Sequence, residues 1–224
     1  MTFYIKANMT RTLILDYGFA RMDRLSQAMT NIGARVYMST DAHEVKSADL
    51  LVLPDGFDND RYLNRGVSDR VLDAIQNHIG QKKPLLAVGT GLFLLTGGFR
   101  HGDTRFRGLG LWDARVGKLD PYMVDGFERP LHSTHLGFGF VVGLDRQPEI
   151  GHLVPPAEKG IWLYFRHRLY ASVRVPFADV AVAHHGIPFA GAIWQPRILA
   201  TQFLPELSGP IGLQILKTWY EGVL

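Results

Sequence analysis

The sequence predicts an α/β protein whose central sheet is mostly parallel, is covered by helices on both faces and continues into an antiparallel extension. In the first half of the chain, short apolar runs alternate with segments of helical periodicity, which is the pattern of βα units. In the second half, short apolar or aromatic runs follow one another, each bounded by Gly or Pro, as in antiparallel strands. With 224 residues the chain is long enough to bury a sizeable core.

The individual elements follow from these patterns in chain order. Apolar residues recur at helical spacing over residues 24–32 and 71–79, and a glycine that would end a helix follows each segment. Strands are expected at residues 12–15, 35–38, 48–53, 85–88, within 114–119, and at 135–142, 160–165, 180–184, 189–194 and 199–203. A last helix is expected over residues 209–222, with Pro210 in its first turn.

The most informative residue is Gly89, which directly follows the predicted strand at residues 85–88. The sequence Gly89-Thr90-Gly91 would turn sharply from that strand into an apolar helix start. Such a turn is typical of a nucleophile elbow, where a Ser or Cys attacks the substrate and backbone N–H groups hold the oxyanion. Gly89 has no side chain, so this elbow would lack its nucleophile. The side chain of Thr90, one residue later, is expected to point away from the pocket as a polar helix-start residue.

Six segments in a fixed order carry a family resemblance over nearly the whole chain. They are LILDYG at residues 13–18, LVLP at 51–54, GLGL with the following RV at 108–116, HLGF at 135–138, YFRH at 164–167 and QFLPE at 202–206. Together they resemble the class I glutamine amidotransferases, most closely the glutaminase subunits of imidazole glycerol phosphate synthase. The resemblance implies a flavodoxin-like three-layer class I glutamine amidotransferase fold in one domain over residues 12–224, with residues 1–11 as an N-terminal extension.

The departures from the family pattern fall on the chemistry. The catalytic Cys of the family is Gly89 here, its His is Leu204, and only the Glu two residues later is kept, as Glu206. A thiolate is needed to attack the glutamine amide, and an imidazole is needed to activate the thiol and to protonate the leaving ammonia. The resemblance therefore implies a catalytically inactive member, a pseudo-glutaminase.

The substrate-binding positions differ from the family as well. Matching places Phe93 and Gly97 where the family recognises the amino-acid end of glutamine. The Gly-rich oxyanion segment reads Pro54-Asp55-Gly56-Phe57-Asp58, in which the anionic Asp55 would oppose an oxyanion. The vestigial pocket is expected to include Asp55, Gly56, Phe57, Thr90 and Phe93.

The resemblance also implies a protein partner. In the resembled synthase, the glutaminase subunit docks on the mouth of a (βα)8 cyclase, and docking uses a different part of the surface from hydrolysis. We expect a docking, structural or regulatory subunit of a synthase, with that cyclase or another synthase subunit as the partner. Tyr17 keeps the family residue near this interface, but Ala20 and Arg21 replace the expected Gly and Asn, which favours a changed partner.

Other functions stay open on the sequence alone. The vacated pocket, lined by Phe57, Gly89, Phe93 and Leu204, could serve a small-molecule sensor, unless these side chains simply fill it. The protein could also be a scaffold for an unrelated complex. A third alternative is an enzyme with a different chemistry, for which the candidate residues are Asp55, Asp58, Glu206, His167, His184 and His185.

Composition narrows the function classes further. The chain has no Cys, which excludes disulfides, thiolate metal sites and cysteine catalysis, and we expect no metal or cofactor. Its net charge of +3 is spread along the chain. The arginine clusters at residues 100–107 and 166–168 indicate solvent-exposed faces or a docking surface for an acidic partner, because nucleic-acid binding would need a more concentrated basic patch. No uncharged stretch reaches the length of a membrane span, and no signal pattern opens the chain, so a cytoplasmic protein starting at Met1 or Met9 is expected.

Overall fold

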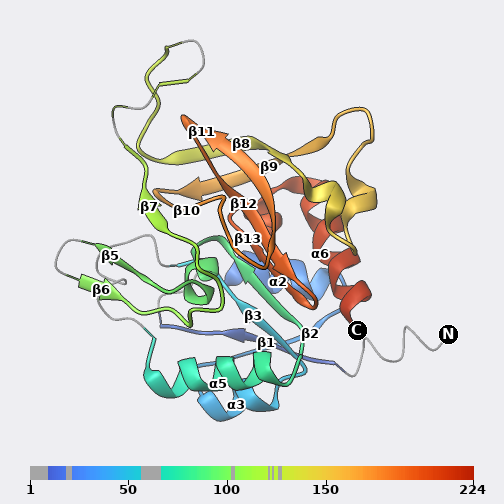
Figure 1. Ribbon diagram of the computed structural model, residues 1–224. Coiled ribbons are helices and arrows are strands. Elements are labelled where there is room, and N and C mark those ends of the chain that lie inside the picture. Colours follow the sequence, from blue (N-terminus) through green and yellow to red (C-terminus); the bar gives the residue numbers. More distant parts are fainter. Residues whose placement is uncertain are drawn as a thin grey trace.

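The computed structural model of the protein describes residues 10–18, 22–56, 67–101, 104–120, 122, 124–125 and 128–224. Its main feature is a nine-stranded sheet with the strand order β2-β1-β3-β4-β13-β12-β11-β8-β9 (Figure 1). The strands are β1 (Arg11–Leu15), β2 (Arg35–Ser39), β3 (Leu50–Leu53), β4 (Leu85–Val88), β8 (His135–Val142), β9 (Gly160–His167), β11 (Asp179–His185), β12 (Ile187–Gln195) and β13 (Ile198–Thr201).

The sheet has a parallel half and an antiparallel half. Strands β2, β1, β3, β4 and β13 pair in parallel, and β12, β11, β8 and β9 continue the sheet in antiparallel pairs. The predicted α/β architecture is confirmed, and the antiparallel extension is as large as the parallel part. In the parallel half the carboxyl ends of β3, β4 and β13 lie at one edge, where ligands bind in open α/β sheets.

Helices cover both faces of the parallel half, which gives three layers. Helices α2 (Asp23–Asn31) and α6 (Gly209–Val223) pack on one face, and α3 (Ala42–Ser47) and α5 (Asp69–Gly80) pack on the other (Figure 1). Successive residues of a strand point to opposite faces, so Ile14 joins the α2 and α6 side of the core while Leu13 and Leu15 join the other side. Within the described residues, no helix combines the length and apolar character that a membrane crossing needs.

Several short elements complete the fold. Strands β5 (Phe99–His101) and β6 (Thr104–Phe106) form a hairpin, and β7 (Val116–Lys118) pairs with β10 (Leu169–Ala171). The segment after the elbow is the 3-10 helix η1 (Gly89–Leu95), followed later in the chain by η2 (Leu144–Arg146), η3 (Gly151–Leu153) and η4 (Pro205–Leu207). The expected helix start at residue 89 is thus only a 3-10 helix.

The antiparallel half curls back over the elbow. Strand β9 is the last strand of the sheet, yet it contacts η1 and η4, which follow the distant strands β4 and β13. Two hydrogen bonds fix this arrangement: the Leu204 amide donates to the Tyr164 carbonyl oxygen (2.8 Å), and the Tyr164 amide donates to Ser208 Oγ (2.9 Å). Side chains from β9 therefore reach the carboxyl edge of the parallel strands.

Candidate functional site

The turn after β4 has the backbone geometry of a nucleophile elbow. Gly89 is buried and has a φ of 57°, in the left-handed region that residues with a side chain rarely adopt. The strand, the sharp turn and the following helical segment match the expected arrangement, in which the side chain at the turn would project above the sheet edge.

The carboxylate of Asp55 lies against this elbow. Asp55 follows β3 and is 1% exposed, and its Oδ1 accepts hydrogen bonds from the Thr90 amide (3.0 Å) and from Thr90 Oγ1 (2.7 Å). Arg166 on β9 pairs with the other carboxylate oxygen at 3.4 Å. The amide after the nucleophile is a standard oxyanion donor of an elbow. Here that donor already holds a fixed negative charge.

Asp55 also occupies the space that a side chain at position 89 would need. A Cβ atom built on Gly89 would lie 2.6 Å from Asp55 Oδ1 and 2.8 Å from its Cγ, closer than real Cβ atoms approach other atoms. It would also lie 2.9 Å from Cδ2 of Leu204. The place of a nucleophile is therefore filled from two sides, by the carboxylate and by the leucine.

The remaining apolar residues of the expected pocket belong to the core. Leu204 and Phe93 are both fully buried, and the Phe93 ring packs edge-on against Phe99 with ring centroids 5.8 Å apart. Gly97 is exposed, at the end of the segment that follows η1. Both side chains are packed in the core, Leu204 on the α2 and α6 side of the sheet and Phe93 on the α3 and α5 side.

Glu206, which matches the family's Glu in the sequence, lies in η4 with its Oε2 out of contact with solvent. The pKa of Glu206 is raised to about 7, mainly by burial and to a lesser extent by the Asp55 charge, while a backbone hydrogen bond and Arg166 act in the opposite direction. Burial also raises the pKa of Tyr17 well above its usual value, again with a contribution from Asp55. The Asp55 charge therefore contributes to both shifts, although burial is the main cause of each.

The position of Thr90 corrects one prediction. Its side chain does not point away from the pocket: it is buried, donates to Asp55 and accepts a hydrogen bond from the Gly56 amide at 2.9 Å. The reason is the buried carboxylate, which needs donors that a backbone amide alone cannot supply. Other predicted positions, Phe57, Asp58, Ala20 and Arg21, lie outside the described residues.

The histidines named in the sequence analysis lie elsewhere, in and beside a buried cluster. His135 stacks on His185 (centroids 4.5 Å apart) and lies edge-on to His167 (5.2 Å). Burial lowers the pKa of His135 to about 3 and that of His167 to about 4, with the other imidazoles adding to both shifts. No pattern in the sequence singled out His135 for this cluster, because its histidine partners come from two other strands, β9 and β11.

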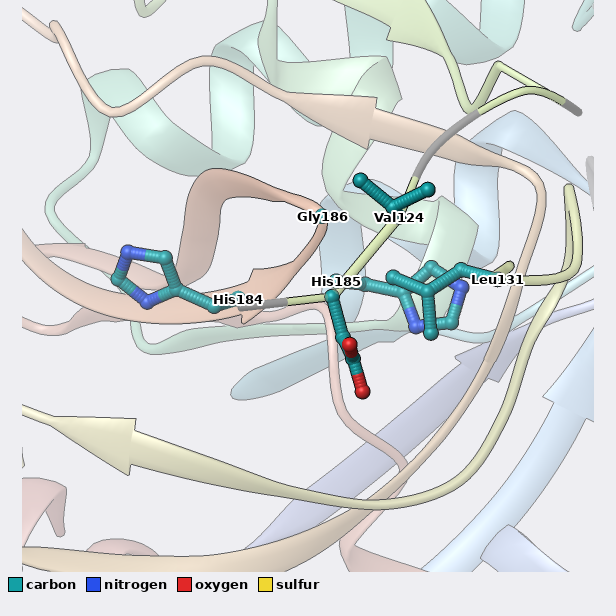
Figure 2. Close-up of a pocket in the computed structure, with 6 residues that line it drawn as sticks. Val124, Leu131, His184, His185 and Gly186 are labelled. Atoms are coloured by element: carbon teal, nitrogen blue, oxygen red, sulfur yellow. The ribbon is translucent and has the colours of Figure 1, made fainter. Parts of the chain in front are cut away.

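A small cavity lies at the outer end of this cluster. It has a volume of about 280 Å³, and Figure 2 shows the His185 ring beside Leu131, with His184 pointing the opposite way. The lining residues are Val124, Asp125, Leu131, His184, His185 and Gly186. Within the residues that the structure describes, no group of three or more His, Asp or Glu side chains is placed to hold a metal ion.

An exposed apolar face lies on the neighbouring strands β8 and β9. We call it the aromatic face, and it consists of Leu136, Phe138, Phe140, Val142, Trp162 and Tyr164. Trp162 is 58% and Phe138 is 55% exposed, and cross-strand ring pairs join Phe138 to Tyr164 and Phe140 to Trp162. A contiguous patch of this kind marks an interaction surface more often than a free surface. The sequence predicted the strands but not that this face is left uncovered.

Comparisons with known proteins identify relatives and structural neighbours of the chain. No family model matches the chain. The imidazole glycerol phosphate synthase subunit HisH of Geobacter sulfurreducens is 30% identical over 95% of this chain and 99% of its own length, and the HisH of Deinococcus radiodurans is 32% identical over 92% and 91%.

Solved structures share the fold at much lower identity. A crystal structure of a glutamine amidotransferase superposes with a TM-score of 0.65 at 15% identity, covering 94% of this chain and 99% of the other. The fold and the full-length similarity thus lead to one conclusion. The chain belongs to the family of the HisH subunits of imidazole glycerol phosphate synthase, within the class I glutamine amidotransferases.

Proposed function

We propose that this protein is a pseudo-glutaminase, a HisH-like subunit that has lost glutamine hydrolysis and acts by docking on a synthase partner. The observation that carries the proposal is the filled elbow. Gly89 supplies no nucleophile, and the carboxylate of Asp55 stands where one would be. Without nucleophile and base, little covalent catalysis remains in a site of this type.

The other positions of the site support the same conclusion. Leu204 cannot accept or donate a proton, and it is packed where the family's histidine would stand. Glu206, with its pKa near 7, is partly protonated at neutral pH and has no imidazole to orient. A negative charge bonded to the Thr90 amide would repel the oxyanion of a tetrahedral intermediate.

The aromatic face supports a protein partner. Its rings are exposed on the same strands that curl over the elbow. Burying large aromatic side chains supplies much of the energy of protein interfaces. We propose a (βα)8 cyclase or another synthase subunit, in the cytoplasm, as the occupant of this face.

The experiment is affinity purification of the tagged protein from its own host, followed by glutaminase assays of whatever complex is recovered. We expect a synthase subunit at near-stoichiometric level and no ammonia release from glutamine, whereas free ammonia should support the partner's reaction. Glutamine hydrolysis by the purified protein or its complex would overturn the loss of catalysis. Recovery of unrelated proteins alone would overturn the synthase partner and favour a scaffold for another complex.

A further inference from the structure

Donors from two segments contact both carboxylate oxygens of Asp55. Oδ1 accepts from the Thr90 amide and hydroxyl at 3.0 and 2.7 Å, and Oδ2 faces the Arg166 guanidinium at 3.4 Å. Gly56 donates its amide to Thr90 Oγ1, which orients the hydroxyl toward Asp55. A buried carboxylate with a backbone amide, a hydroxyl and an arginine as partners is held by charge-assisted hydrogen bonds on both oxygens.

These donors come from segments that are far apart in the sequence. Thr90 belongs to the elbow, and Arg166 reaches the site from β9, whose strand curls over the sheet edge. Arg166 is about one-third exposed, while its Nε is buried without a hydrogen-bond partner among the described residues. The buried Nε–H of Arg166 is therefore a second donor on the guanidinium. A carboxylate that binds an arginine through both oxygens accepts from two such donors.

The geometry points to a carboxylate-binding site at the elbow, and in the native chain the side chain of Asp55 occupies it. The inference deepens the proposed loss of glutaminase activity, because it states what took the place of the substrate's acyl group. It predicts that removal of the Asp55 side chain opens a site for a small monocarboxylate such as formate. It also predicts that Asp55 hinders a side chain at position 89, given the 2.6 Å approach of a Cβ atom to Oδ1.

The first test is rescue of the variant Asp55→Gly by formate. We expect the variant to unfold at lower urea concentration than the native chain, because it leaves Arg166 and the Thr90 amide without their carboxylate. Sodium formate should raise its thermal midpoint saturably and by at least a few degrees more than sodium chloride at equal ionic strength. The same comparison should give no formate-specific shift in the native chain or in Asp55→Gly/Arg166→Gln.

A matched control separates binding from a general salt effect. Asp73→Gly places glycine inside α5 at an exposed position and should destabilise the protein without opening a carboxylate site. Formate should act on this variant no more than chloride does. Equal rescue of Asp73→Gly and Asp55→Gly, or no formate-specific rescue of Asp55→Gly, would overturn the inference.

A second measurement covers the case in which Asp55→Gly folds poorly. The chain has no Cys, so Gly89→Cys introduces a single thiol at the elbow. Iodoacetamide should modify this thiol at least tenfold faster in Asp55→Asn/Gly89→Cys than in Gly89→Cys, because a neighbouring carboxylate disfavours the reactive thiolate. Equal labelling rates in the two variants would refute the role of Asp55. Neither measurement involves glutamine or a partner, so the inference and the proposed function can fail separately.

Discussion

Rebuilding the catalytic pair by Gly89→Cys and Leu204→His should restore almost no glutaminase activity while Asp55 is present. A Cβ atom at position 89 would approach Asp55 Oδ1 to 2.6 Å and Leu204 Cδ2 to 2.9 Å, so Gly89→Cys alone overpacks a buried site. Overpacking of this kind costs about 1–3 kcal/mol in the free energy of unfolding. Leu204→His removes one of the two close contacts but leaves the carboxylate.

The expected loss of activity follows from the Thr90 amide. In elbow enzymes, loss of one oxyanion donor lowers kcat by about 10²–10³. The double variant should therefore hydrolyse glutamine at least about 100-fold more slowly than an intact HisH subunit, because its donor amide stays bonded to Asp55 and Phe93 stands at a position where the family recognises glutamine. The assay is ammonia release from glutamine, with urea unfolding of each variant to verify the fold.

Adding Asp55→Gly to the double variant provides the internal comparison. The triple variant should be faster than the double variant, since the amide donor is then available to an oxyanion. Hydrolysis by the double variant within about tenfold of an intact subunit would refute the reasoning, because it would show that Asp55 does not obstruct the site.

Three further predictions concern pH and docking. Glu206→Gln should match the native chain in stability near pH 4.5 and exceed it at pH 8, because the native protein loses stability as pH rises through the raised pKa of about 7; urea unfolding at several pH values tests this. In the native chain the lowered pKa of His135 reduces the free energy of unfolding as the pH falls from about 6.5 toward 3, by roughly 1.4 kcal/mol per pH unit. The variant His135→Phe should lose less stability over this range, and unchanged acid unfolding would contradict the prediction. Trp162→Ser should weaken partner capture at least tenfold, whereas Phe177→Ser, an exposed aromatic outside the aromatic face, should not, as measured by quantitative pull-down.

Local patterns were sufficient for most strands and for the longer helices. The apolar runs of β8 and β4 give the bounds of these strands to within a residue or two. Helix α3 was not predicted because it has six residues, of which only Val45 is buried, and so shows no usable periodicity. The short strands β5, β6 and β10 have three residues each, too few for an alternating pattern.

The sequence predicts which residues form the site but not how they are arranged. Family matching named Gly89, Leu204 and Asp55 from the sequence. It could not reveal the ion pair of Asp55 with Arg166, which joins residues 111 positions apart through the curl of β9 over the elbow. It also could not reveal the direction of the Thr90 side chain, because that direction depends on the burial of a charge supplied by another loop.

The close packing at the elbow has an evolutionary consequence. A change of Gly89 back to Cys would meet the Asp55 carboxylate and the Leu204 methyl group, so this single step yields a strained protein with no gain in activity. Change of Asp55 alone would lose the partner of Arg166, again with no nucleophile gained. Under the proposed loss of glutaminase activity, each of these residues therefore blocks reversal of the others in a single step, and hydrolysis would return only through several changes made together.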